Sequence, residues 1–512
     1  MSRLKKFTHS LLSGYVSVGA NMFYTFTSYP LALHYLGKAE FGLWALVAQI
    51  SGFIALIDFG MANSVSRFLI DHKDDRRDGA YGSVIKTSVL VGLAQGGLII
   101  LAGGVLAALA GFVPKVTPDM QREFAWLVIG QSLLTGLSYA TRVFNYLLVA
   151  HQRLDIPNYG YTLTFFLNLG GMWAGMAVGW GIYGFLAGQV LGTLGNVMVG
   201  YCGCARLNLF PGRNEWGAVT WVRFRELFAY GRDNFLMGIG WQFISASQTS
   251  LLFCLLGPET AAVWSFCTRT YGVVTMLVWR IFDFSTPALV EMMVRGERDR
   301  LLRRFRDITV FSASLSLVGA VLLAVCNRSF VWLWTGGKIH WADGNNILLA
   351  VACFLATAVR PHTTLATQTK QFGFLRFVFL VEGLMFVGLN LLAYRMAGMT
   401  TLLMFSILCT LSFTLPYGLY RTRHYFNLDR RGLAGWFMPT VRLTLWLLPV
   451  ALGTAWLMRG LPALWQLGVN LLVTGIWGGV MLLRHGLGES LQAEIMGRAP
   501  VRVQGVLKRL MP

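Results

Sequence analysis

The chain has 512 residues, of which 55% are hydrophobic and only 13% are charged, whereas roughly a quarter of the residues are charged in ordinary soluble domains. This composition excludes a soluble globular protein and predicts a membrane protein. The formal net charge of +20 would suggest a nucleic-acid partner for a soluble chain, but basic loops on one side of a membrane explain it without nucleic acid.

Apolar windows long enough for a hydrocarbon core of ~30 Å recur along the whole chain. We expect fourteen spans, at 9–36, 41–70, 82–111, 124–150, 157–181, 183–206, 228–256, 258–288, 307–334, 344–370, 374–395, 399–420, 437–458 and 463–484. The first follows a basic head but is too long and too polar for a signal peptide, so it is expected to be retained. One face of it carries polar residues, namely Ser10, Ser17, Asn21, Tyr24 and Ser28.

Acidic residues are placed inside two of these windows. Asp58 lies in the second window and Glu382 in the eleventh. Either residue is a candidate to bind a coupling cation or proton, and either is equally a candidate structural residue. Asp58 in particular can cap backbone groups or pair with an arginine of another span. Arg67 follows Asp58 near the inner end of the same window.

Arginines are placed deep in three windows. Arg142 shares a helical face with polar residues, namely Gln131, Thr135, Ser138 and Asn145. Arg269 and Arg280 lie eleven residues apart in the eighth window, and Arg360 precedes a proline in the tenth. Because an arginine at bilayer depth is costly, such residues usually face a bundle interior or a watery cavity. The excess of arginine over carboxylate favours an anion-binding cavity, although Arg280 has Asp283 one turn away as a structural partner.

Several chemistries lack support in the sequence. The seven cysteines form no C-x-x-C motif and no Cys/His cluster, so neither a disulfide framework nor a metal site is expected. No Walker A, H-E-x-x-H or G-x-S-x-G motif occurs, and His362 alone is weak evidence for a membrane acyltransferase. We therefore expect a protein that is not an enzyme and needs no cofactor. The basic stretch 293–307 is expected to be an interfacial helix that faces anionic headgroups.

Lysine and arginine are distributed unequally between alternate loops. With the N-terminus inside, the inner segments hold 28 and the outer connections hold 6. This asymmetry predicts that both termini are cytoplasmic.

A short element occurs twice. Leu36, Gly37 and Trp44 have the same spacing as Leu256, Gly257 and Trp264, and each element joins two expected spans. An even repeat of six helices returns the chain to the same side, so parallel repeats are expected. The predicted domains are an N-terminal lobe of spans 1 to 6, a cytoplasmic linker, a C-terminal lobe of spans 7 to 12, spans 13 and 14, and a cytoplasmic tail, at 1–206, 207–227, 228–426, 437–484 and 485–512.

The run from Tyr29 to Ile70 resembles the N-terminal signature of bacterial polysaccharide flippases, the O-antigen and exopolysaccharide translocases of the multidrug/oligosaccharidyl-lipid/polysaccharide exporter superfamily. The matching features are Leu36-Gly37, Phe41-Gly42-x-Trp44, Asp58-x-Gly60 and Arg67. The resemblance implies an all-α polytopic protein of about 14 transmembrane helices in the bacterial inner membrane. Two six-helix lobes would surround a V-shaped cavity, and two further helices would follow them.

The resemblance also implies a function. The protein would flip a polyprenyl-pyrophosphate-linked oligosaccharide outward by alternating access, among membrane lipids and other polysaccharide-assembly proteins. In that picture the headgroup is bound by Arg142, Arg269, Arg280 and Arg360, with Ser17 and Asn21 on the cavity wall. The alternatives are a cation-coupled multidrug exporter of the same superfamily, a peptidoglycan lipid-precursor flippase, and a membrane-embedded transferase.

Overall fold

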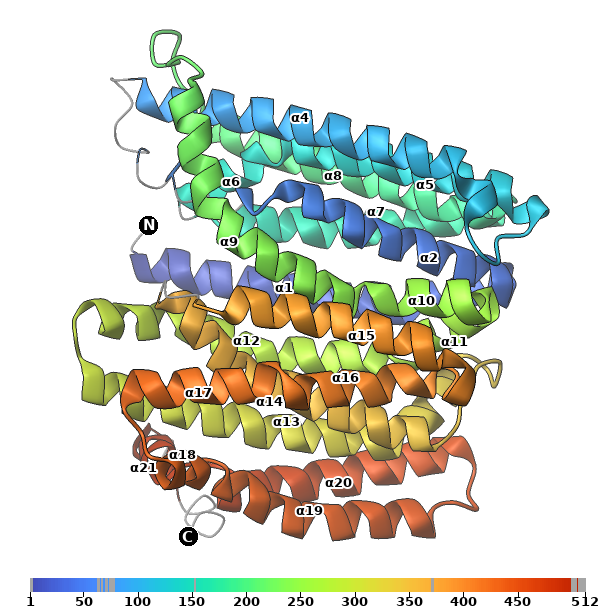
Figure 1. Ribbon diagram of the computed structural model, residues 1–512, viewed down its shortest axis with the longest axis vertical. Coiled ribbons are helices and arrows are strands. Elements are labelled where there is room, and N and C mark those ends of the chain that lie inside the picture. Colours follow the sequence, from blue (N-terminus) through green and yellow to red (C-terminus); the bar gives the residue numbers. More distant parts are fainter. Residues whose placement is uncertain are drawn as a thin grey trace. The chain divides into compact units, whose positions relative to one another are not determined.

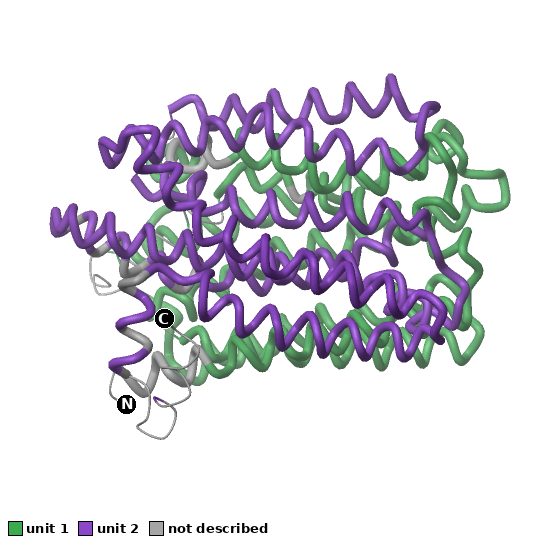
Figure 2. Tube along the Cα trace, turned by 90° about the horizontal axis from the view of Figure 1, so that it is seen from below, with its two compact units in different colours: residues 1–262 green, residues 263–512 purple. Residues whose placement is uncertain are grey.

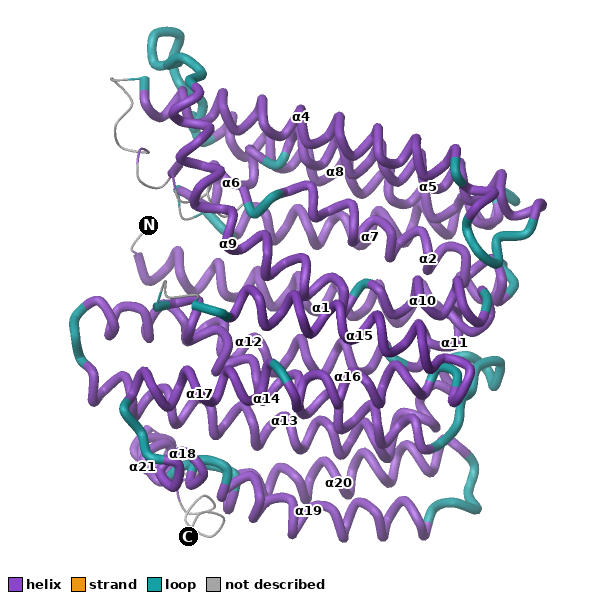
Figure 3. The backbone as a smooth tube through the Cα atoms, in the orientation of Figure 1, coloured by secondary structure: helices purple, strands orange, loops and turns teal. Residues whose placement is uncertain are grey.

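The structure is a computed structural model that describes residues 3–61, 79–151, 153–369 and 373–498, together with the single residues 65, 68, 69, 72 and 504. Within these residues every regular element is a helix (Figures 1 and 3). The all-α architecture predicted from the apolar windows is therefore confirmed. Arg67 lies outside the described residues.

The first half of the chain contains the following helices: α1 (Arg3–Tyr35), α2 (Lys38–Ile54), η1 (Ala55–Asp58), α4 (Ala80–Ala108), η2 (Ala110–Phe112), α5 (Pro118–Thr141), α6 (Val143–Ala150), α7 (Asp155–Ala177), η3 (Gly181–Tyr183), α8 (Gly184–Arg206), α9 (Trp221–Ser245) and α10 (Ser247–Leu256).

The remaining helices are α11 (Pro258–Cys267), α12 (Arg269–Val294), α13 (Arg298–Trp334), α14 (Gly344–Gln368), α15 (Leu375–Ala397), α16 (Thr400–Ser412), α17 (Thr414–Phe426), α18 (Arg430–Gly435), α19 (Met438–Leu457), α20 (Ala463–His485) and α21 (Glu489–Arg498).

Each of the fourteen predicted windows overlaps one helix or two helices in succession. In the described part of the chain, nine helices are long and apolar enough to cross a membrane, or ten if α9 and α10, which meet at a bend of 41°, form one span. The protein is thus a multi-pass membrane protein, and the total of fourteen spans stays a prediction.

Packing divides the chain into two compact units, Met1–Ala262 and Val263–Pro512 (Figure 2). In the first unit α7 packs against α8 and α1, and α4 packs against α5. The helices α9 and α10, which the repeat assigns to the second lobe, belong to the first unit by packing, and α10 contacts α2. Repetition and packing are different properties, so the lobe boundaries drawn from the repeat stay a prediction.

The two Leu-Gly elements form helix junctions. In each case the leucine and glycine lie where one helix ends and the next begins, at α1–α2 and at α10–α11. The tryptophans that follow are core residues: Trp44 stacks on Phe185 with ring centroids 4.3 Å apart, and Trp264 meets Trp341 edge to face at 6.0 Å. Burial of these large rings explains why an aromatic residue follows each junction.

The connection between α8 and α9 is fastened to α4. The Tyr81 hydroxyl donates to the carbonyl of Leu209 at 3.0 Å, and the Ser83 hydroxyl donates to the carbonyl of Ala218 at 2.7 Å. Between these points Lys86 Nζ lies 5.6 Å from the centre of the Trp216 ring. The predicted linker is therefore held against a helix on both sides of its exposed turn.

Candidate functional site

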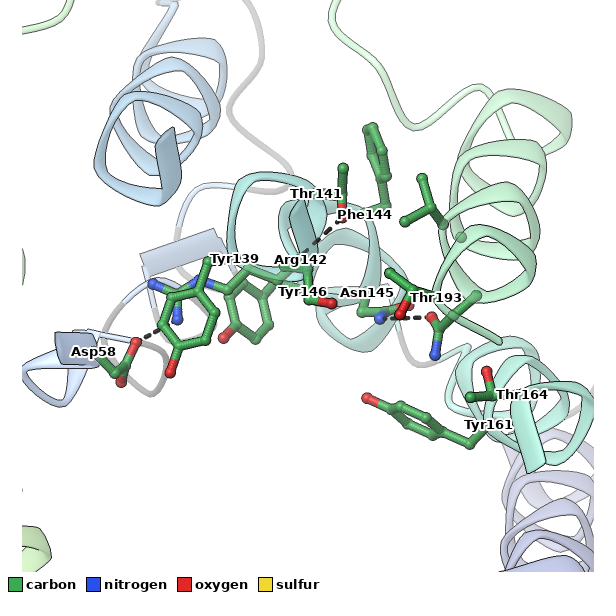
Figure 4. A pocket seen from close by; sticks show the side chains of 14 residues that line it. Asp58, Tyr139, Thr141, Arg142, Phe144, Asn145, Tyr146, Tyr161, Thr164 and Thr193 are labelled. Atoms are coloured by element: carbon green, nitrogen blue, oxygen red, sulfur yellow. Dashed lines mark hydrogen bonds and ion pairs between the residues drawn. The ribbon is translucent and has the colours of Figure 1, made fainter. Parts of the chain in front are cut away.

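The first unit contains a polar cavity of about 570 Å³ that is built mainly by α5, α6, α7 and α8 (Figure 4). Its lining residues are Asp58, Ser138, Tyr139, Thr141, Arg142, Phe144, Asn145, Tyr146, Tyr161, Thr164, Thr193, Asn196, Val197 and Gly200. Most of them carry a hydroxyl, an amide or an aromatic ring. A cavity with these groups within an otherwise apolar helical unit is the default candidate for a ligand site.

Arg142 lies at a break between two helices, after α5 ends at Thr141 and before α6 begins at Val143. The preceding turns carry three hydroxyls that donate to the carbonyl four residues back, at 2.8 to 2.9 Å: Thr135, Ser138 and Thr141. Such bonds compete with the helix ladder and bend it. The break follows these turns directly and places Arg142 at the corner of the cavity.

The Arg142 guanidinium is paired rather than free. Its Nη1 bonds the carboxylate of Asp58, and its Nη2 donates to the side-chain oxygen of Gln95. The side chains of Arg142 and Asp58 are 14% and 20% exposed. The guanidinium also lies 4.6 Å from the ring centre of Tyr139 and 5.7 Å from that of Tyr146, which is cation–π geometry.

Asp58 is held at the end of its helix by the local backbone. The short helix η1 ends there, and Phe59 and Gly60 follow with φ of 50° and 71°. The Gln95 amide nitrogen donates to the carbonyls of Ile57 and Asp58 at 3.1 and 2.9 Å, so it satisfies acceptors that a helix end leaves unpaired. Of the interpretations offered by the sequence, pairing with an arginine of another span is the one seen.

The rest of the cavity wall is uncharged. Asn145 donates to Asn196 at 3.4 Å, and the Thr164 hydroxyl bonds backbone carbonyls of α7 and α8. In Figure 4 the hydroxyl ends of Tyr139 and Tyr161 point toward the same open space. Amides and hydroxyls both donate and accept hydrogen bonds, so this wall suits a neutral polar ligand such as a sugar.

The predicted wall residues of α1 do not line this cavity, and their role stays a prediction. Ser17 and Asn21 are half-buried and are not among the residues that line the cavity. The α1 helix packs on α7, where Asn158 donates to Ser13 at 3.1 Å, and Asn21 accepts from Thr25 at 3.3 Å.

The other three predicted arginines lie in the second unit. Arg269 opens α12 and is half-buried, whereas Arg280 is exposed on the same helix. Arg360 of α14 places its guanidinium 4.2 Å from the ring centre of Trp279. The ring contact brings Arg360 against the turn of α12 that carries Arg280. The side chain of Asp283, the predicted alternative partner of Arg280, lies outside the described residues.

Glu382 and His362 are core residues of the second unit. Glu382 is 2% exposed and accepts from the hydroxyls of Thr410 and Thr414, beside the break between α16 and α17. His362 is 1% exposed, and its Nδ1 lies 2.8 Å from the Thr422 hydroxyl. Packing accounts for His362, while a coupling role for Glu382 stays a prediction.

Some residues that line the cavity or bond to Arg142 were not predicted from the sequence. Tyr139 and Tyr146 lie three residues before and four residues after Arg142, which is the spacing of neighbours on one helix face. Gln95 is the one amide side chain in the apolar window 82–111. That isolated polar side chain was the signal that could have marked Gln95 as a partner of a buried charge. Tyr161 and Asn196 come from other helices, and no local pattern connects them with Arg142. Among the described residues, no three His, Cys, Asp or Glu side chains lie close enough together to hold a metal ion.

No protein-family model and no curated protein matches the sequence. The fold, however, is similar to solved structures. An inward-facing multidrug resistance MATE family transporter of the MOP superfamily matches with a TM-score of 0.65 and 12% identity, over 81% of this chain and 99% of that one. The lipid II flippase MurJ in an inward closed conformation also gives 0.65 and 12%, over 90% and 98%.

A third similar structure is the MATE multidrug transporter DinF-BH, with a TM-score of 0.62 and 12% identity, over 84% of this chain and 98% of that one. At this identity the likeness establishes the fold. The chain has the fold of the MOP-superfamily transporters, the superfamily to which the sequence resemblance pointed. Its MATE and MurJ branches match about equally well.

Proposed function

We propose that the protein flips a polyprenyl-pyrophosphate-linked oligosaccharide from the cytoplasmic to the periplasmic leaflet of a bacterial inner membrane. It would act by alternating access, in the biosynthesis of cell-surface polysaccharide or exopolysaccharide and together with other polysaccharide-assembly proteins. The observation that carries the proposal is the cavity of the first unit. Its wall of hydroxyls, amides and tyrosine rings suits sugar residues, and its one described arginine is already paired with a carboxylate.

A pyrophosphate carries several negative charges, so its binding calls for more than one cationic side chain. Arg142 has five N–H donors, of which at least two bond protein groups, so it can still donate to a sugar. We assign the pyrophosphate to Arg269, Arg280 and Arg360. A guanidinium stays charged in the membrane and binds phosphate with two parallel hydrogen bonds.

The substrate tail needs no site of its own in this scheme. A polyprenyl chain is as apolar as the bilayer core, so it can stay in lipid while the headgroup crosses the protein. Two alternatives within the superfamily keep some support, because MATE exporters and the lipid II flippase MurJ have similar folds. A cation-coupled drug exporter would use Asp58 or Glu382 as a coupling site, and the ion pair with Arg142 already neutralises the carboxylate of Asp58.

The test measures exposure of a radiolabelled polyprenyl-linked oligosaccharide in the outer leaflet of cells with and without the protein. Variants Arg269→Gln, Arg280→Gln and Arg360→Gln are compared with Arg213→Gln, a control at an exposed residue of the linker. We expect exposure to depend on the protein and to fall at least tenfold in the first three variants, because each removes a charge-assisted contact to phosphate worth about 1.5–3 kcal/mol, while the control is unaffected.

Two results would contradict the proposal. If exposure is the same without the protein, the oligosaccharide substrate is wrong and a small-molecule exporter becomes the leading candidate. If the labelled lipid-linked peptidoglycan precursor, measured in the same cells, is the species whose exposure is lost, the protein belongs with the precursor flippases.

A further inference from the structure

A second polar cavity lies in the second unit, at the end of α19 and α20 where the short helices α18 and α21 also lie (Figure 1). Its volume is about 690 Å³. It is lined by Arg306 of α13, Arg442 of α19, and Arg484 and His485 of α20. All three arginines are exposed, and three separate helices bring them to one cavity on the side predicted to be cytoplasmic.

None of the described residues that line the cavity is acidic. The carboxylate of Asp307 is close by, but it is 3% exposed and lies beneath Gly488, with its Oδ1 3.2 Å from the position of an added Cβ there. The positive charge that faces the cavity is therefore not offset by a carboxylate facing it from the described wall. Such a site favours an anion.

The cavity is preformed by packing. Its floor contains the buried side chains of Val310, Trp436 and Leu487. Gln492 of α21 donates to the carbonyls of Leu483 and Arg484 at 3.2 and 3.5 Å, so α21 is fastened across the end of α20. These contacts order the backbone around the cavity before a ligand arrives, which reduces the entropic cost of binding.

An apolar stripe leads away from the cavity along α19. Met438, which lines the cavity, is followed on the same helical face by Val441 and Leu445, and the three are 49%, 50% and 69% exposed. In a membrane-spanning helix, exposed apolar side chains face acyl chains. A ligand that has both an anionic head and apolar tails would therefore contact the arginines and the stripe together.

We propose that this cavity binds the phosphate-bearing headgroup of an anionic membrane phospholipid, with the acyl chains lying on the stripe Met438, Val441 and Leu445. The adjoining stripe favours a lipid over free phosphate, because a soluble anion would make no use of it. The site is distinct from the polar cavity of the first unit, and it holds whether or not the transported substrate is an oligosaccharide.

Binding is tested on the purified full-length protein in detergent, by native mass spectrometry with added phosphatidylglycerol. Diacylglycerol, which has the tails without phosphate, and glycerol 3-phosphate, which has the phosphate without tails, serve as separate probes. The double variant Arg442→Gln/Arg484→Gln removes two cavity charges. The matched control Arg430→Gln/Arg431→Gln removes two exposed charges of α18 that do not line the cavity.

We expect phosphatidylglycerol to bind the unaltered protein, and each cavity arginine removed to weaken binding roughly fivefold. The control should change binding by no more than about twofold, since exposed charges outside the site contribute little. Gly435→Leu keeps every charge and adds a side chain where nothing lies within 4 Å of a new Cβ, and it should also weaken binding by partly filling the cavity. Elution volume and melting temperature verify that each variant is folded.

Equal losses in the cavity variant and the control would overturn the proposal, because charge alone would then explain binding. Glycerol 3-phosphate binding as tightly as the phospholipid would overturn the lipid assignment. Tight binding of diacylglycerol would remove the role of the phosphate.

Discussion

Asp58 and Arg142 are 84 positions apart in the sequence and form an ion pair at the edge of the polar cavity. Both residues could be singled out from the sequence, because each is a charged residue deep inside an apolar window, where a charge is costly to bury. Their pairing was one of several options left open by the sequence, since only the packing of α2 and η1 against α4 and α5 decides which charges meet. The same packing adds Gln95, which no local pattern connects with either residue.

The ion pair predicts non-additive effects of substitution. Asp58→Asn or Arg142→Gln alone leaves a partly buried charge without its partner and should destabilise the protein by about 3 kcal/mol. The double variant should cost less than the sum, because no unpaired charge remains. Melting temperatures of the four proteins in detergent form the cycle that measures the coupling.

Additive effects in that cycle would show that the two residues act independently. Arg328 and Asp343 form an exposed ion pair, with side chains 68% and 65% exposed, and the same cycle there provides the control. Exposed pairs contribute about 0–1 kcal/mol, so the control cycle should show little coupling.

At the scale of the helices, the apolar windows predicted where helices occur but not where they break. The window 124–150 is divided at Arg142, and the window 399–420 is divided at Phe413. No proline or glycine adjoins the break at Arg142, whereas Pro416 follows Phe413 by three residues and lacks the N–H that would bond the carbonyl of Ser412, where α16 ends. Hydropathy reports whether a segment suits lipid or water, whereas a break without a proline depends on neighbouring helices, so the corner at Arg142 could not be predicted from the apolar window.

Close helix packing in the first unit depends on small residues. A Cβ on Gly188 of α8 would lie 2.3 Å from the carbonyl oxygen of Asn168 in α7. Gly188→Ala should therefore push the two helices apart and destabilise the protein by about 1–3 kcal/mol. Thermal unfolding monitored by tryptophan fluorescence measures the loss.

Gly170→Ala in the facing helix is the matched control, since nothing lies within 4 Å of a Cβ added there. Alanine is the better helix former, so this variant should be neutral or slightly stabilising. Equal effects of the two substitutions would show that helix propensity, and not the α7–α8 contact, determines the outcome.

At the scale of the whole molecule, composition and window length were enough to predict an all-α multi-pass membrane protein, and the signature in 29–70 pointed to the superfamily whose fold the structure shares. The ligand could not be predicted in the same way. Cavity residues such as Tyr161 and Asn196 come from different helices, and sugar recognition by scattered hydroxyls and amides has no linear code.

The orientation in the membrane is a further prediction for the whole molecule. Inner segments are rich in lysine and arginine, so a reporter enzyme active only in the periplasm should be inactive when fused after 426 or at the C-terminus. The same reporter should be active when fused after 460, between α19 and α20. Activity at 426 or at the C-terminus would reverse the orientation, and it would also move the phospholipid cavity to the other leaflet.

Hydrogen bonds to α4 hold the 207–220 connection on both sides of its exposed turn. Leu209 and Ala218 are anchored on either side of Arg213, and α10 packs against α2 independently of that segment. A protease site inserted after Arg213 should therefore be cleavable without separating the two pieces, which should elute together in detergent and keep their melting temperature. Pieces that come apart would show that the peptide bond itself holds them. If they stay together, contacts between helices, and not the continuous chain, hold the folded protein in one piece at this point.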